Sequence, residues 1–417
     1  MSTTEEATPT PPPTEPDPTA AAATKESMPT GAKDLLNRVR TGDLGSLRVL
    51  ILLAIVWIIF QSQESRFLSA TNIVNLSLQI TAVALISVGV VLVLLLGEID
   101  LSVGAVSGVT SAIVAVLSVK HGWGPVPAIL AGLAVGAAIG TFQGFISTRF
   151  GIPTFVVTLA GLLGWQGLQL KVLGETGTVN LNPGLLTDLA GKFLSDGAGW
   201  IVAIVCVVLF ALATMRGYQK RVASGLAAPA FPLVVIRIAA VAIAALLFVY
   251  VVNQDRGVPV AVLILVGFVA AFDFMTRRTK FGRHIYAVGG NMEAARRAGI
   301  AVFRVRVLVF ALASTMAAVG GIMAASRLLA VNQSSGGSDL LLNSIAGPVI
   351  AGTSLFGGRG NVWSALLGAL VIGSISNGMD LLAYTSATKF MVTGAVLLGA
   401  VVLDSAARMG RAASGRV

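Results

Sequence analysis

Apolar runs long enough to cross a lipid bilayer recur along most of this chain. The run Ile73–Leu96 contains no charged residue, and a helical bilayer crossing needs about 20 predominantly apolar residues. The whole chain is 55% hydrophobic and only 12% charged, whereas about 25% of the residues of a soluble domain are charged. The sequence therefore predicts an integral membrane protein and excludes a soluble globular one.

Twelve apolar windows are candidates for membrane spans. They cover residues 47–60, 73–96, 102–119, 126–147, 152–172, 199–214, 233–252, 258–275, 307–329, 339–355, 362–383 and 388–405. The first, third, sixth and tenth windows are short, so we expect them to be broken or re-entrant. Many of the 47 glycines fall inside apolar windows, which helices tolerate, and the windows lack the alternation of barrel strands. We predict an all-α polytopic transmembrane bundle of 10 to 12 spans with broken helices.

The distribution of Lys and Arg predicts the orientation of these spans. With the N-terminus inside, twenty basic residues fall on the cytoplasmic side and seven on the outer side. Cytoplasmic loops of membrane proteins carry this excess. An even number of spans with both termini in the cytoplasm is therefore expected.

The ends of the chain differ in composition from the apolar part. Residues 1–30 hold seven of the fifteen prolines, so we expect residues 1–46 to be a disordered cytoplasmic tail with a basic lead-in and no secretory signal. Residues 47–405 form the expected membrane domain, and 406–417 a basic cytoplasmic tail. The longest outer connection, 173–198, has turn signals, and we expect it to hold a short surface helix that receives a partner protein.

Several classes of function are disfavoured by composition. The chain has one cysteine and two histidines, so neither a thiolate cluster nor a His/Cys metal site is expected. Its net charge of +10 is explained by topology and by contact with anionic membrane lipid. Nucleic acid is not an expected partner, because no basic patch is interleaved with aromatic residues. A phosphate-binding loop of the Gly-x4-Gly-Lys-Ser/Thr type is absent, so any ATP hydrolysis must occur on another polypeptide.

Two Gly-rich polar breaks interrupt the apolar sequence. The first, Gly97–Ser102, places Glu98 and Asp100 beside a long apolar run. Ionisable groups at membrane depth mark functional sites by default. A second interpretation, compatible with the first, is that Asp100 and Ser102 cap a helix that starts at Leu101. A similar break lies within 345–362, and the two predict a parallel internal repeat.

A basic loop, Thr276–Arg306, carries eight Lys and Arg residues and one acid, Glu293. Gly289–Asn291 is expected to form a turn, with its asparagine capping a short helix over 292–298 that ends at Gly299. An amphipathic helix on anionic lipid would also explain the positive charge. However, the helix offers only one methionine and alanines as apolar side chains, which favours docking into a protein cleft.

Four motifs in order resemble those of a known family: GEIDLSVGAV, TKFGRHIYAVGGN, GGNMEAARRAGI and AGTSLFGGRGNVWSALLGALVIGSISNGMDLL. The third is similar to the EAA coupling motif of ABC-importer permeases, and together they resemble the ribose/xylose/galactose branch of sugar permeases over about residues 67–405. The extra pair of spans within 215–252 is most similar to the xylose type. The family's first motif usually reads Gly-Gly-Ile-Asp, and here Glu98 replaces the second glycine.

The resemblance implies a transporter subunit in a bacterial cell membrane and not an enzyme. It implies a homodimeric channel for a monosaccharide, D-xylose or another pentose, which an extracytoplasmic sugar-binding protein supplies. A separate ATPase subunit would bind ATP and Mg²⁺, and this chain would hold no cofactor of its own. The residues that the resemblance assigns to ATPase coupling are Gly289, Gly290, Asn291, Glu293, Ala294, Ala295 and Gly299.

Polar and aromatic residues within or beside the spans are candidates for the substrate pathway. Amides and hydroxyls suit sugar hydroxyls, and aromatic rings can stack on a sugar. Hydrogen bonding between helices explains a membrane Asn or Gln equally well. The candidates are Asn75, Gln79, Glu98, Asp100, Ser102, Gln143, Phe155, Trp165, Gln166, Asn343 and Asn377. Phe142 and Gln169 are weighed with them.

Three other functions are alternatives to a permease. An ion-coupled secondary transporter or channel would use Glu98 and Asp100 as its proton or cation site. A membrane enzyme is disfavoured, because neither a Gly-x-Ser-x-Gly nor a His-Glu-x-x-His motif occurs. A scaffold would leave the polar residues and the broken spans without a role.

Overall fold

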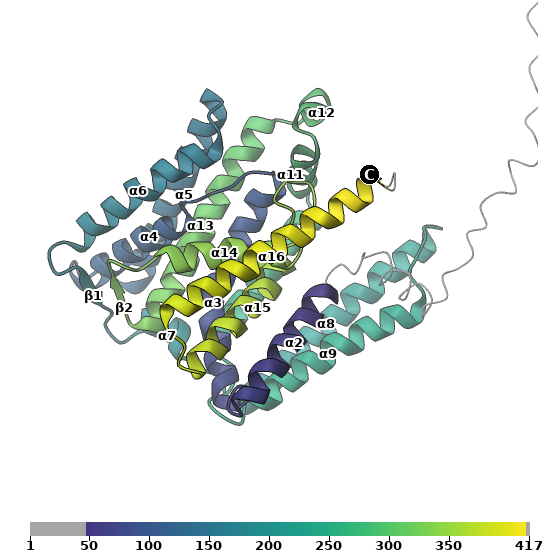
Figure 1. The fold of residues 1–417 in the computed structure, drawn as a ribbon, viewed down its shortest axis with the longest axis horizontal. Helices are drawn as coiled ribbons and strands as arrows, with labels where there is room; N and C mark the ends of the chain where they lie inside the picture. The colour runs from purple at the N-terminus through teal and green to yellow at the C-terminus, as the bar shows by residue number, and fades with distance from the viewer. Residues whose placement is uncertain (1–46, 414–417) are drawn as a thin grey trace, which may run out of the picture. The chain divides into compact units, whose positions relative to one another are not determined.

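The structure is a computed structural model that describes residues 47–413, with the side chains of residues 400, 401 and 403–413 excepted. The tail expected over 1–46 and the last four residues of the basic C-terminal segment lie outside the described residues. The described chain is a bundle of helices with one two-stranded sheet (Figure 1).

The helices of the first half are α2 (Leu47–Gln63), α3 (Ala70–Leu95), α4 (Val103–Val119), α5 (Pro125–Phe150), α6 (Thr154–Leu173), α7 (Leu185–Gly191) and α8 (Asp196–Ala223). Those of the second half are α9 (Phe231–Val252), α10 (Val260–Arg278), α11 (Lys280–Gly290), α12 (Met292–Arg297), α13 (Val302–Leu328), α14 (Ser338–Ile350), α15 (Trp363–Leu381) and α16 (Ser386–Ala413). Among the described residues, eight helices are long and apolar enough to cross a membrane. Four more apolar stretches, in α2, α4, α14 and α16, are shorter. These twelve helices coincide with the twelve apolar windows, so a polytopic helical membrane protein is confirmed.

Two of the short windows behave differently from each other. The tenth corresponds to α14, which has only 13 residues and contains Pro348. Because proline lacks an N–H and crowds the preceding turn, it limits the helix, which ends at Ile350. The sixth window is not broken, contrary to the prediction: α8 is one continuous helix of 28 residues that includes a basic last turn. Hydropathy detected only its apolar part, whereas helical hydrogen bonding continues into the polar part.

Burial distinguishes central helices from peripheral ones. In the most apolar window of α3, 83% of residues are buried, and in that of α13, 61%. The corresponding share for both α8 and α9 is 11%, and these two helices form a hairpin beside the bundle (Figure 1). A helix that is apolar all round and buried belongs to the core. Helices α3 and α13 therefore form the buried centre of the bundle, and the polar sites lie beside them.

Glycines at every fourth position let α5 lie close to α13. Gly132, Gly136, Gly140 and Gly144 follow one face of α5. A Cβ atom at Gly136 would lie 2.9 Å from the backbone oxygen of Ser314 in α13. Such small-residue faces replace the hydrophobic effect as the cause of helix association in lipid.

The connections at one end of the bundle are ordered. Strand β1 (Thr178–Asn180) pairs antiparallel with β2 (Ala330–Asn332). The short surface helix expected within 173–198 is confirmed as α7, whereas the sheet was not anticipated. This sheet holds the segment that follows β2, residues 333–337, beside α4.

Candidate functional site

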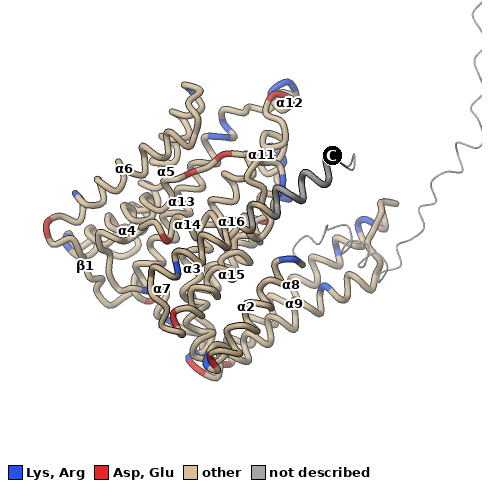
Figure 2. Tube along the Cα trace, in the orientation of Figure 1, with Lys and Arg blue, Asp and Glu red and all other residues tan. Residues whose placement is uncertain are grey.

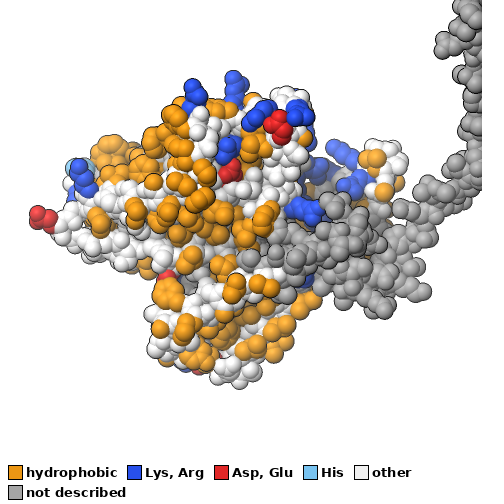
Figure 3. Space-filling view, turned by 45° about the horizontal axis from the view of Figure 1, so that its top comes forward, with side chains coloured by type: hydrophobic (Ala, Val, Ile, Leu, Met, Phe, Trp, Pro, Cys, Tyr) orange, Lys and Arg blue, Asp and Glu red, His pale blue; other side chains and the backbone are white. Residues whose placement is uncertain are grey.

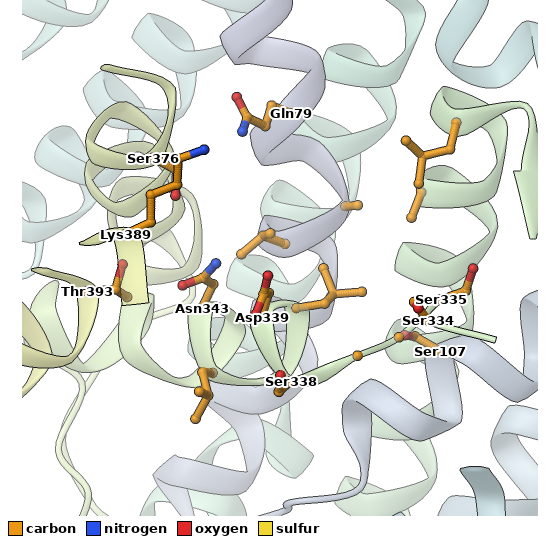
Figure 4. A pocket seen from close by; sticks show the side chains of 18 of the residues that line it. Gln79, Ser107, Ser334, Ser335, Ser338, Asp339, Asn343, Ser376, Lys389 and Thr393 are labelled. Atoms are coloured by element: carbon orange, nitrogen blue, oxygen red, sulfur yellow. The ribbon is translucent and has the colours of Figure 1, made fainter. Parts of the chain in front are cut away.

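A cavity of about 670 Å³ lies between α3, α4, α13, α14, α15 and α16. Its volume is within the range of about 300–1,000 Å³ that is typical of small-molecule sites. Figure 4 shows polar side chains from helices on opposite sides of this cavity facing a common space. The arrangement can surround a small polyhydroxylated molecule with hydrogen-bonding groups.

Polar side chains at i, i+4 spacing line the cavity. Residues four apart occupy the same face of a helix. The pairs are Ser107 and Ser111 on α4, Asp339 and Asn343 on α14, Ser376 and Asp380 on α15, and Lys389 and Thr393 on α16. Gln79 of α3 adds an amide to the same space (Figure 4).

The charges around the cavity are balanced. Lys389 of α16 forms an ion pair with Asp380 of α15. Arg327, at the last turn of α13, and Asp339, at the first turn of α14, also line the space. Two bases and two acids leave the lining without net charge, which suits a neutral ligand.

Only two of the predicted pathway residues, Gln79 and Asn343, line this cavity. Its charged residues were not among the candidates, and neither were its serines and threonine. Asp339 lies four residues before the candidate Asn343, on the same face of α14. This spacing was the signal in the sequence that could have added Asp339 to the candidate pathway residues.

Gln169, which was weighed as a pathway residue, holds the wall of the cavity. Its side-chain amide donates to the backbone oxygens of Asn332 and Ser335, both at 2.9 Å. Gly108 of α4 lies against the same segment, because a Cβ there would collide with the oxygen of Ser335. The segment 333–337 is thereby fixed between α4 and α6.

Two other asparagine candidates have partners elsewhere. Asn377 and Asn72 of α3 exchange side-chain hydrogen bonds of 3.0 and 2.7 Å in a buried contact. Asn75 is exposed and accepts a hydrogen bond of 2.6 Å from Arg256. Arg256 also donates a hydrogen bond to the neighbouring Asp255, and this bond lowers the pKa of the Asp255 carboxyl below its usual value. The structure thus gives these amides roles in helix and loop contacts.

A second polar group is buried at the first Gly-rich break. Asp100 accepts hydrogen bonds from the backbone N–H and the hydroxyl of Ser102, at 2.8 and 2.6 Å. The same hydroxyl lies 3.0 Å from the amide oxygen of Gln143 in α5. Nearby in α6, Trp165 packs edge-to-face with Phe142. The structure therefore brings the candidates Asp100, Ser102 and Gln143 together, away from the residues that line the cavity.

The helix after this break begins later than expected. The sequence suggested a start at Leu101, but α4 begins at Val103, and its N-cap residue Ser102 makes no side-chain cap bond. Asp100 instead binds the N–H of Ser102, two residues along the chain. Asp residues favour such turns over continued helix, which delays the start of α4.

Glu98 has charged and polar partners at the same break. Its carboxylate lies 2.5 Å from Arg306 of α13, and it accepts a hydrogen bond from Thr154 of α6. Both charged side chains are only 13% exposed. A carboxylate in such a pair is not free to serve as a cation or proton site.

The remaining pathway candidates, Phe155 and Gln166, are on the exposed surface of α6. Phe155 is 52% exposed. Neither residue lines the cavity.

The short helix expected in the basic loop is present as α12. Asn291 caps it by accepting a 2.9 Å hydrogen bond from the N–H of Ala294. Gly299 follows its end with a φ of 81°, a left-handed conformation that glycine adopts readily. Glu293 is exposed and pairs with two arginines of α12, whereas Ala295 is buried with 4% exposure. The helix thus presents a charged face outward while its small side chain packs inward.

The prediction of a turn over Gly289–Asn291 is wrong for Gly289 and Gly290. They are the last two residues of α11, and only Asn291 is extended. The sequence of α11 is polar and contains three glycines, so propensity argued against a helix. Tertiary contacts stabilise it instead: Ile285 and Val288 are buried, and the Tyr286 hydroxyl donates to the backbone oxygen of Gly360.

Glycines of three separate segments meet beside α11. The N–H of Gly358, in the second break, donates to the oxygen of Leu95 at the end of α3, at 2.9 Å. A Cβ at Gly289 would collide with that same Leu95 oxygen, and a Cβ at Gly357 would lie 2.6 Å from the oxygen of Gly289. We call Leu95–Gly97, Gly289 and Phe356–Gly358 the glycine junction. It joins both Gly-rich breaks to the loop that carries α12.

The cavity and the glycine junction are separate sites on α3, because Gln79, Ala82 and Val83 line the cavity near the middle of the helix and the junction lies at its end. Gln79 and Leu95 are separated along α3 by about 24 Å, at about 1.5 Å per residue. Figure 2 shows Lys and Arg gathered at the end that carries α11 and α12. In Figure 3 the same end is charged, whereas hydrophobic side chains cover much of the flank. The molecule thus has a polar cavity and, separate from it, an exposed charged helix, α12.

The sequence is similar to those of known transport-system permeases. The xylose transport system permease protein XylH of Escherichia coli (strain K12) is 37% identical over 361 residues, which cover 86% of this chain and 90% of that protein. XylH of Haemophilus influenzae is 35% identical over 361 residues, 86% of this chain and 95% of that protein. The ribose import permease protein RbsC of Bacillus subtilis (strain 168) is 34% identical over 353 residues, 84% of this chain and 90% of that protein. No solved structure matches the chain.

The resemblance to sugar permeases found in the motifs is thereby confirmed. Residues 72–401 match the family described as branched-chain amino acid transport system / permease component. Members of this family are membrane subunits and not themselves enzymes. The chain belongs to this family of transport-system permease components.

Proposed function

We propose that this chain is the permease subunit of an ABC importer for a monosaccharide, D-xylose or another pentose, in the cell membrane. The relatives named for xylose and ribose transport support the substrate class. The observation that carries this proposal is a polar cavity beside the middle of α3, together with an exposed helix, α12, in the loop that contacts the end of α3 at Leu95. Such a layout lets events at α12 alter access to the cavity.

In this proposal the substrate binds in the cavity by hydrogen bonds. The amides of Gln79 and Asn343 offer both donors and acceptors, and the serines add hydroxyls. A sugar hydroxyl needs both kinds of partner. The ion pair between Lys389 and Asp380 lies beside them and leaves the lining neutral.

Transport then proceeds by alternating access. An ATPase subunit holds the exposed face of α12 around Glu293, and closure of its nucleotide-binding sites moves this helix. The glycine junction passes the movement to the ends of α3 and α15. A ligand or partner can shift such an equilibrium only by contacting two states differently, and α12 is the element whose contacts change.

The orientation and the partners follow from the same arrangement. In this proposal the basic end that carries α11 and α12 faces the cytoplasm, and the positive-inside rule supports this orientation. Both termini lie on that side if all twelve apolar helices cross. The opposite end, with α7 and the small sheet, receives the sugar-binding protein, and the resemblance supports a second copy of the chain that completes the channel.

An ion-coupled transporter would use Glu98 and Asp100. Glu98 is paired with Arg306, which a cation at this carboxylate would have to displace. One carboxylate oxygen of Asp100 accepts both hydrogen bonds from Ser102, and its other oxygen is buried without a hydrogen-bond partner among the residues that the structure describes.

Uptake by cavity variants tests the proposal. The chain is reconstituted in proteoliposomes with its ATPase and binding protein, and uptake of labelled xylose is measured. We expect Gln79→Leu and Asn343→Leu each to lower uptake about tenfold, the equivalent of about 1.4 kcal/mol for one lost hydrogen bond.

Gln166→Leu on the exposed surface of α6 is the matched control, since it removes an amide far from the cavity lining. Its uptake should stay within about twofold of the parent. Unchanged uptake in both cavity variants, or an equal loss in the control, would refute the cavity as the binding site.

A further inference from the structure

The ion pair between Glu98 and Arg306 joins four segments of the chain. Arg306 lies 2.5 Å from Glu98 and 3.4 Å from the hydroxyl of Ser147, near the end of α5. Thr154, at the start of α6, donates to the other oxygen of Glu98. The first Gly-rich break is thus tied to α13, α5 and α6 through one carboxylate.

The arginine of the Glu98–Arg306 pair lies close to α12 along the chain. Arg306 lies in the second turn of α13, and only a short connection containing Gly299 separates α12 from α13. The connection is fixed, because the N–H of Ile300 donates to the oxygen of Ala295 at 3.0 Å. Ala295 and Val302 are both buried in the same apolar cluster. Helix α12 and the start of α13 therefore move as one body.

The loop that carries α12 consequently holds the first break at two points. Before α12, Gly289 packs directly on the oxygen of Leu95. After α12, Arg306 holds Glu98 three residues further along. The first contact depends on shape alone, whereas the second is a directional, charged contact with little exposure to solvent.

We propose that the Glu98–Arg306 pair is a mechanical link that transmits displacement of α12 to the α3–α4 break. Glu98 and Arg306 are positioning residues that contact neither ATP nor sugar. Because the pair is shielded from water, its attraction is screened little, and it can move the break together with α13. The inference rests on the proposed function, since it assumes that a partner ATPase moves α12.

The coupling ratio tests this link directly. In proteoliposomes that contain the permease, its ATPase and the binding protein, labelled xylose taken up per ATP hydrolysed is measured for parent and variants. For Glu98→Gln we expect the ratio to fall at least about fivefold, while the ATPase remains bound and its rate stays within about twofold of the parent.

Two double variants separate coupling from loss of the fold. Glu98→Gln with Arg306→Gln removes both charges and leaves no unpaired buried charge, and its ratio should stay low. Glu98→Arg with Arg306→Glu exchanges the charges and should recover at least about half of the parental ratio, because attraction depends on opposite sign and not on which side carries it.

Glu64→Gln is the matched control, because it removes a more exposed ion pair, with Arg66, in the connection between α2 and α3. Its ratio should equal that of the parent. The link is overturned if Glu98→Gln keeps the parental ratio, if the exchanged variant is no better than Glu98→Gln, or if the control falls equally. If the parent binds no ATPase at all, the proposed function fails and the link with it, which is a distinct result.

Discussion

Asn377 illustrates how a polar residue inside an apolar span can have two different roles. From the sequence, its amide could form hydrogen bonds either with a sugar hydroxyl or with a polar group of another helix. In the structure it exchanges hydrogen bonds with Asn72 of α3, 305 positions away in the chain. Nothing local to either asparagine indicates this partner. The chemistry of such residues could be predicted, whereas the choice between substrate and protein could not.

The pair makes a prediction about stability. Asn377→Leu removes the donor to the buried side-chain oxygen of Asn72, whose nitrogen keeps its hydrogen bond to the backbone oxygen of Phe67, so we expect the unfolding free energy to fall by about 1 kcal/mol. The double variant Asn72→Leu with Asn377→Leu should lose less than the sum of the two single changes, because no amide is orphaned. Thermal unfolding in detergent measures both. Strictly additive losses would show that the two amides do not interact.

The helices were predictable wherever apolar length alone determined them. All twelve apolar windows became helices, because a span in lipid must satisfy its own backbone hydrogen bonds. Helix α11 was missed, since Lys280–Gly290 is polar and ends in two glycines. Its stability comes from buried Ile285 and Val288 and from the contact of Tyr286 with the second break. Those contacts are made to residues far along the chain, so no local pattern predicts them.

Adjacent glycines at the end of α11 provide a matched pair of variants for the glycine junction. A Cβ at Gly289 would collide with backbone atoms of Leu95, whereas a Cβ at Gly290 would meet nothing within 4 Å. We expect Gly289→Ala to lower sugar uptake at least about tenfold while the protein still inserts, because the backbone at the junction must shift.

Gly290→Ala should leave uptake unchanged or slightly stabilise the protein, since alanine favours helix more than glycine does. Uptake in proteoliposomes, normalised to inserted protein, compares the two variants. Equal uptake by Gly289→Ala and the parent would show that close packing at the junction is not needed for transport.

At the scale of the whole molecule, the proposal connects two sites through the central helices. The short helix α12 could be predicted from the sequence, because its caps are local. The cavity could not, because its lining comes from six helices whose relative rotation is set only by packing. Gln79 and Asn343 were identified individually, but their convergence with Asp380 and Lys389 required the structure.

The central claim is that α12 binds an ATPase, and co-purification tests it most directly. The tagged protein is extracted in mild detergent, and bound proteins are identified by mass spectrometry for the parent, Glu293→Lys and the control Glu175→Lys. Glu293 is exposed on α12 and pairs with Arg296 and Arg297, whereas Glu175 is exposed in the connection between α6 and β1. Both changes reverse one exposed charge, but only the first alters α12.

We expect a nucleotide-binding ATPase with the parent and with Glu175→Lys, and its loss from Glu293→Lys. Absence of any ATPase from the parent after crosslinking, or equal recovery with Glu293→Lys, would contradict the assignment of α12 as the coupling element.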